Sequence, residues 1–222
     1  MHYDAMTRDH GLPHDPFKAL VAPRPIGWIG TLDAQGRANL APYSFFNAVS
    51  DRPPMVVFSS GGRKDSLCNI AQTGEFTCSL ATWALRDAMN LSSATVAPGV
   101  DEFALAGLEK AASRFVKPPR VAASPAALEC RLWQMLELPA PPGRPAAVHT
   151  VVFGHVVGIY IDDAFIRDGM VCTGEMQPIA RMGYMEYAAV RPAAVFSMNR
   201  PLAAADGRSA QVPQTPWDGV YR

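Results

Sequence analysis

The chain has 222 residues, of which 49% are hydrophobic and 18% are charged. This length suits one large domain, or one domain with an appendage, and the apolar content argues against intrinsic disorder. The 20 basic and 20 acidic residues cancel, so the chain lacks the basic excess that binding to nucleic acid requires. The low share of charged residues predicts additional buried or subunit-facing surface.

Residues 26–59 show the patterns of β-strands. Residues 26–32, the turn formers at 33–36 and the aromatic-rich residues 37–50 predict a β-hairpin. Residues 55–59 form a short, continuous apolar run. Such a run is typical of a strand buried on both faces, so we expect it at the centre of the sheet.

The rest of the core alternates between short helices and strands. Apolar residues at helical spacing predict a helix from Asp65 until Gly74, followed by a strand over 75–80. Residues 84–92 and 101–107 predict two short helices. Residues 128–132 alternate at the period of a half-buried strand, and 151–161 is the longest strand candidate. Its glycines, at 154 and 158, predict a bulge or a close backbone approach.

We place the main domain at residues 1–188, with an N-terminal lead-in segment, and a C-terminal arm at 189–222. From Arg191 onward the arm carries prolines but also Phe196, Trp217 and Tyr221. A free tail would gain little by exposing these aromatic residues. We therefore expect the arm to pack on the domain or on a partner subunit.

Targeting and metal-binding signals are missing from the sequence. The N-terminus lacks the regions of a secretory signal, and the longest apolar stretch is too short for a membrane span. The cysteines form no CxxC pair, which favours reduced core thiols in a cytoplasmic protein. His2, His10 and His14 lie close in sequence, but nothing completes a metal site, so we expect none. His155 fits a hydrogen-bonded core or interface residue.

A stretch of hydroxyl, glycine and basic residues follows the apolar run: Ser59, Ser60, Gly61, Gly62, Arg63, Lys64, Asp65 and Ser66. A strand that passes through two glycines into a helix brings backbone N–H groups, a helix N-terminus and two cations to one point. This arrangement suits a phosphate group. A capped helix with solvated Arg63 and Lys64 is an equally good interpretation of this stretch alone.

Residues 39–47 combine aromatic and hydrogen-bonding side chains around a proline: Asn39, Leu40, Ala41, Pro42, Tyr43, Ser44, Phe45, Phe46 and Asn47. The proline removes one ladder donor, so the segment should leave regular pairing and expose backbone amides. A planar heterocycle would fit against it. Because neighbouring residues point to opposite faces, at least one aromatic ring must fill the core.

Taken in order, several segments make the sequence similar to the flavin reductase-like family of FMN-binding split-barrel proteins. They are residues 23–31, 39–47, 53–59, 64–66 with 69–70, 73–76, 99–103 and 178–183. The resemblance covers most of residues 17–188. It implies a mainly β fold with flanking helices, a six-stranded antiparallel split β-barrel, and a homodimer with FMN at the subunit interface.

Carried over by position, the resemblance assigns the cofactor-binding residues within this sequence. It assigns the phosphate to Ser60, Arg63, Lys64 and Ser66. Ser59 and Asp65, in the same stretch, are also assigned to the cofactor site. It gives the flavin ring and ribityl chain to Thr31 and to Ala41, Pro42, Tyr43, Ser44, Phe45, Phe46 and Asn47, with Arg181 nearby. Two departures, His155 in place of a common acidic residue and the arm, concern the far side of the pocket.

The resemblance implies an oxidoreductase in which NADH or NADPH passes a hydride to flavin N5. The flavin carries the chemistry, so no side chain is assigned a catalytic role. Three readings stay open on the sequence. They are an NAD(P)H-dependent flavin reductase, an FMN-binding electron carrier reduced by a partner protein, and a dimerisation module without flavin.

Overall fold

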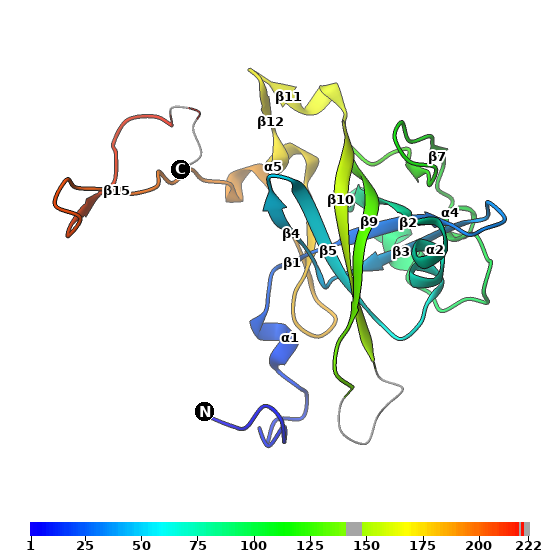
Figure 1. Ribbon diagram of the computed structural model, residues 1–222. Helices are drawn as coiled ribbons and strands as arrows, with labels where there is room; N and C mark the ends of the chain where they lie inside the picture. The colour runs from blue at the N-terminus through cyan, green and yellow to red at the C-terminus, as the bar shows by residue number, and fades with distance from the viewer. Residues whose placement is uncertain (141–147, 218, 220–222) are drawn as a thin grey trace.

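The computed structural model describes residues 1–140, 148–217 and 219. An antiparallel sheet of seven strands, in the order β3-β2-β6-β9-β10-β5-β4, forms its centre (Figure 1). In that order the strands are β3 (Ala38–Tyr43), β2 (Gly27–Leu32), β6 (Glu75–Leu80), β9 (Ala126–Glu137), β10 (His149–Ile161), β5 (Pro54–Gly61) and β4 (Phe46–Asp51). The mainly β class with flanking helices is confirmed.

Short elements surround this sheet. The helices are α1 (Phe17–Leu20), α2 (Asp65–Thr73), α3 (Arg86–Leu91), α4 (Glu102–Leu105), α5 (Thr173–Met176) and the 3-10 turns η1 (Asp163–Phe165) and η2 (Pro192–Ala194). The small sheets pair β1 (Arg24–Pro25) with β13 (Ile179–Arg181) and β14 (Tyr187–Ala189), β7 (Lys110–Ala111) with β8 (Arg120–Val121), β11 (Ile166–Arg167) with β12 (Met170–Val171), and β15 (Leu202–Ala203) with β16 (Ala210–Gln211). The predicted helices over 65–74, 84–92 and 101–107 are confirmed as α2, α3 and α4.

The predicted hairpin is confirmed for β2 and β3, but its second half ends at Tyr43. Residues 46–51 pair instead with β5, as a further edge strand. This edge strand makes seven strands in the described sheet, one more than the predicted six. The closure of the sheet into a barrel stays a prediction.

The prediction that residues 55–59 form a central strand buried on both faces is wrong. β5 is second from the edge, and buried residues alternate along it with partly exposed ones. A strand buried on both faces is β2, where Ile29 packs in one apolar cluster and Trp28 in another. Alternate side chains of β5, Val57 and Ser59, line a cavity described below. The apolar run therefore packs against the core on one face and lines this cavity on the other.

The long strand β10 has irregular pairing and a close approach at its two glycines, as predicted. Its pairing with β9 shifts register between Phe153 and Gly154 and again between Val156 and Gly158. A Cβ atom at Gly154 would lie 2.4 Å from Cζ of Phe76, a fully buried ring. The backbone of β10 and this ring therefore approach each other more closely than any side chain at position 154 allows.

We expect Gly154→Ala to destabilise the fold by about 1–3 kcal/mol, because a well-packed ring must move to admit a methyl group. Urea unfolding of the purified protein measures this loss. Gln134→Ala, an exposed position opposite Phe153 on β9, serves as the control and should change stability by less than about 0.5 kcal/mol. Equal stability of Gly154→Ala and the control would contradict the close approach.

The C-terminal arm leaves the domain after η2 and extends away from the sheet (Figure 1). The Asn199 Nδ2 group closes its small hairpin by donating to the carbonyl oxygens of Pro213 and Thr215, at 2.8 and 2.7 Å. Phe196 is 77% exposed and Trp217 49% exposed, while Tyr221 lies outside the described residues. Within one chain, the domain therefore does not cover Phe196. Packing of the arm on a partner subunit stays a prediction.

Candidate functional site

A cavity of about 720 Å³ lies between the lead-in segment, the β4–β5 pair and the start of β10. Five of the sequence-predicted site residues line it, namely Ser44, Phe45, Phe46, Asn47 and Ser59. The other lining residues are 20–25, 57–58, 138, 149 and 151. Its volume is in the range of small-molecule sites, about 300–1,000 Å³. The structure thus brings residues 44–47 and Ser59, near the end of β5, to one cavity.

The turn between β3 and β4 carries residues that line one wall of this cavity. Pro42 itself stays paired opposite Trp28, so the segment leaves regular pairing only at Ser44 and Phe45. β3 is an edge strand, which tolerates the proline, and the chain bends away from the sheet at Ser44 and Phe45 before β4 begins. Phe46 packs directly on the backbone of Gly27, where a Cβ atom would lie 2.5 Å from Cδ2 of the ring. Gly27 therefore lets the aromatic segment lie against β2.

The loop after β5 leads into the N-terminus of α2 and carries two cations. Gly62 has φ of +75°, and Lys64, the N-cap residue, makes no side-chain hydrogen bond to the first turn. Arg63 and Lys64 are exposed, and neither forms an ion pair within the described part of the chain. An uncapped helix N-terminus beside two such cations is suited to an anion. Of the alternative interpretation, the side-chain cap is absent, whereas the solvent exposure of Arg63 and Lys64 is as expected.

Behind this loop lies a buried polar network that includes Thr31 and Ser66. The Asn39 Oδ1 atom accepts hydrogen bonds from the Ser66 hydroxyl at 2.9 Å and the Thr31 hydroxyl at 3.2 Å. The Asn69 amide donates to the Thr31 hydroxyl at 2.9 Å. Thr31 is fully buried and Ser66 nearly so, and their hydroxyls join α2 to β2 and β3 through Asn39. Their assignment to the flavin and its phosphate stays a prediction.

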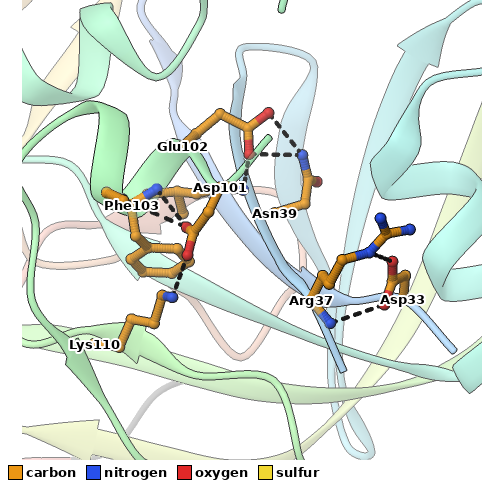
Figure 2. Close-up of polar contacts among 9 residues, drawn as sticks. Asp33, Arg37, Asn39, Asp101, Glu102, Phe103 and Lys110 are labelled. Atoms are coloured by element: carbon orange, nitrogen blue, oxygen red, sulfur yellow. Dashed lines mark hydrogen bonds and ion pairs between the residues drawn. The ribbon is translucent and has the colours of Figure 1, made fainter. Parts of the chain in front are cut away.

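The network ends on a carboxylate, that of Glu102 at the start of α4 (Figure 2). Asn39 Nδ2 donates to both of its oxygens, at 3.0 and 2.9 Å, and the Leu40 N–H donates at 2.9 Å. Burial raises the pKa of Glu102, although these hydrogen bonds act in the opposite direction. Asp101 holds the helix in place, because it caps α4 and contacts Lys110 (Figure 2).

Tyr43 and Ser60 are buried as well, near the two predicted binding regions. The Tyr43 ring packs against Phe58, with 4.8 Å between ring centroids. Its hydroxyl finds no hydrogen-bond partner among the described residues, and burial raises its pKa. The Ser60 hydroxyl donates to the Gly62 carbonyl oxygen at 3.4 Å, and so steadies the loop.

The remaining predicted residues are separate from the cavity lining. Ala41 and Pro42 are half-buried on β3. Asp65 accepts a hydrogen bond from the Gly99 N–H at 3.3 Å. Arg181 turns to the β13–β14 hairpin, where its guanidinium donates to the Tyr187 hydroxyl and the Tyr184 carbonyl oxygen.

Sequence reasoning missed two polar residues of the cavity, Arg24 and His149. Arg24 lies within a segment that carries the family resemblance, but no pattern distinguished its side chain from a solvated one. His149 begins β10, and its Nδ1 atom lies 3.3 Å from the Ser59 hydroxyl. Only the pairing of β10 with β5, which sets Val151 opposite Ser59, brings this histidine to the cavity.

Residues 20–180 match the family of the flavin reductase like domain. The chain belongs to this family. A curated relative from Deinococcus radiodurans is 38% identical over 194 residues, which are 82% of each chain. Membership of the flavin reductase-like family indicates a redox function that involves flavin, and it agrees with the resemblance noted in the sequence.

Solved structures of the same fold include nitrilotriacetate monooxygenase component B from Bacillus cereus. It is 26% identical, covers 85% of this chain and 95% of its own, and superposes with a TM-score of 0.76. The 2-nitrobenzoate 2-nitroreductase of Pseudomonas fluorescens is 24% identical, covers 92% of this chain and 100% of its own, and has a TM-score of 0.78. The second likeness shows the fold alone.

Metal-binding clusters and membrane-spanning helices are absent from the described residues. No group of three or more His, Cys, Asp or Glu side chains within residues 1–140 and 148–217 is placed to hold a metal ion. No helix in the described part of the chain is long and apolar enough to cross a membrane.

Proposed function

We propose that this protein binds FMN and reduces it with NADH or NADPH. The observation that carries the proposal is the uncapped N-terminus of α2, with Arg63 and Lys64 beside it, at the end of the strand whose Ser59 lines the cavity. A phosphate fits the helix N-terminus and cations. A planar ring fits the adjoining, largely apolar cavity.

The described residues divide this task between them. Arg63, Lys64 and the first-turn N–H groups of α2 would hold the phosphate. The residues around Ser44 to Asn47 and Ser59 would hold the ring. Thr31 and Ser66 would act from behind, by fixing the position of α2 against the sheet through Asn39.

FMN, when bound, supplies a hydride acceptor at N5. The side chains of the cavity then need only bind and orient the ring and exclude water from it. Phe45 and Phe46 provide apolar surface for this purpose, and Ser59 with His149 provides hydrogen-bonding groups at the rim. Membership of the flavin reductase-like family supports a flavin-dependent redox role. The name of one structural relative, a monooxygenase component, supports a redox role as well.

Anaerobic mixing of the FMN-loaded protein with NADH or NADPH tests the proposal. We expect loss of the oxidised flavin absorbance near neutral pH with at least one nucleotide, at a rate that saturates with nucleotide concentration. Bound FMN that neither nucleotide reduces would instead favour the electron carrier. A protein that takes up no FMN would contradict both and favour the dimerisation module.

We also propose a homodimer in which residues 189–222 form an arm that packs on the surface of the partner subunit. Exposed apolar side chains on β9, β10 and the arm support it, among them Trp133, Ile159 and Phe196. Water-exposed aromatic surface of this kind is typical of protein interfaces.

Truncation after Arg191 should weaken the dimer roughly tenfold or more, equivalent to about 1.4 kcal/mol, with unaltered flavin reduction per site. Sedimentation at several protein concentrations measures the first effect and stopped-flow absorbance the second. Faster release of flavin with an intact dimer would show instead that the arm covers the flavin site.

A further inference from the structure

The wall of the cavity contains a buried cation that the proposed FMN site does not use. Arg24 is only 6% exposed and lines the cavity, with its guanidinium carbon 6.0 Å from the centre of the Phe45 ring. Its Nη atoms donate to the carbonyl oxygens of Lys18, Val21 and Met182. Its Nε atom is buried and has no hydrogen-bond partner among the residues described.

No carboxylate of the described residues is paired with this charge. Arg24 forms no ion pair with any acidic residue of the described chain. Its register partner across β1 and β13 is a second cation, Arg181. Burial and the charge of Arg181 lower the pKa of Arg24. Buried charges in proteins are normally paired, because removing an isolated charge from water is unfavourable.

The surroundings of Arg24 indicate what kind of molecule would supply the missing negative charge. The cavity walls are largely apolar and include Pro23 and Pro25. The Phe45 ring lies nearest to the guanidinium among the aromatic contacts of Arg24, with its centre 6.0 Å from the guanidinium carbon. Ser59 and His149 add hydrogen-bonding groups. Such a pocket selects a flat, largely apolar molecule with a single anionic group, because a strongly polar ligand would leave its other polar groups unpaired.

We propose that the cavity binds a small aromatic or conjugated organic acid, with its carboxylate placed against Arg24. This inference rests on the proposed function, in which such an acid would bind beside the flavin as a substrate or electron acceptor. The alternative role for Arg24 is purely structural. Its hydrogen bonds to three backbone carbonyl oxygens would then join the lead-in segment to the β13–β14 hairpin.

Calorimetric titration with benzoate and with its neutral isostere benzamide separates these roles. We expect the wild-type protein to bind benzoate at least tenfold more tightly than benzamide, both with flavin removed and with saturating FMN. Arg24→Gln should abolish this preference while benzamide affinity changes little. Arg24→Lys should retain part of the preference, because it keeps the charge, and Arg181→Gln should retain most of it.

Three results would overturn the inference. They are equal affinities for benzoate and benzamide in the wild-type protein, an undiminished preference in Arg24→Gln, and a preference that disappears when FMN is present. The last would mean that the flavin ring itself occupies the position beside Arg24. If Arg24→Gln fails to fold, the wild-type comparison and Arg24→Lys still decide. A preference for benzoate in a protein that binds no FMN would overturn the proposed function but not the acid site.

Discussion

Joint replacement of Arg63 and Lys64 by alanine should weaken FMN binding by roughly 100-fold or more, while riboflavin binding stays nearly constant. Only FMN carries the phosphate that these cations would hold at the uncapped N-terminus of α2. Each hydrogen bond to a charged group contributes about 1.5–3 kcal/mol, and about 1.4 kcal/mol corresponds to a tenfold change in affinity. Flavin fluorescence quenching with both ligands measures the two dissociation constants.

A matched control removes the same charge elsewhere. Arg52 and Lys117 are exposed, and neither takes part in the proposed site. Arg52→Ala with Lys117→Ala should leave the ratio of FMN to riboflavin affinity unchanged. An equal loss of affinity for both flavins in the Arg63 and Lys64 double variant would place the phosphate elsewhere.

Glu102→Ala should destabilise the fold by roughly 2–6 kcal/mol. The substitution leaves the Asn39 amide and the Leu40 N–H as buried donors without their acceptor, and each such donor costs about 1–3 kcal/mol. Glu102→Gln, which keeps one carbonyl acceptor and the side-chain shape, should lose less. Urea unfolding of the three proteins gives the ranking, and a Glu102→Ala variant as stable as the wild-type protein would contradict it.

The same carboxyl group makes stability depend on pH. Burial raises the pKa of Glu102 in the folded protein, so the folded state keeps this proton to a higher pH than the unfolded state. Stability from this group is therefore present below its unfolded pKa and falls as pH rises through the folded value. Between pH 4 and 8, the wild-type protein should lose stability relative to Glu102→Gln. A constant difference across this range would contradict the raised pKa.

Local features of the sequence determined the elements that depend on residues close together in the chain. The helix over 65–74 was predicted from its apolar spacing and from Gly74, which adopts φ of +72°. Gly154 and Gly158 also predict the irregular pairing of the long strand β10. The candidate anion site could also be predicted, because its strand, glycine loop and helix N-terminus are consecutive in sequence. In each case the cause is a backbone preference or periodicity that a short segment carries by itself.

Tertiary structure alone decided which side chains face the cavity and which face the core. Thr31 and Ser66 looked available for a ligand, yet Asn39 and the distant Glu102 hold them in a buried network. Nothing in the local sequence marked Arg24 or His149 as a cavity residue. Pairing of β1 with β13 positions Arg24, and pairing of β10 with β5 positions His149. The burial and hydrogen bonding of a side chain depend on partners that folding brings from far along the chain, and no local pattern encodes these partners.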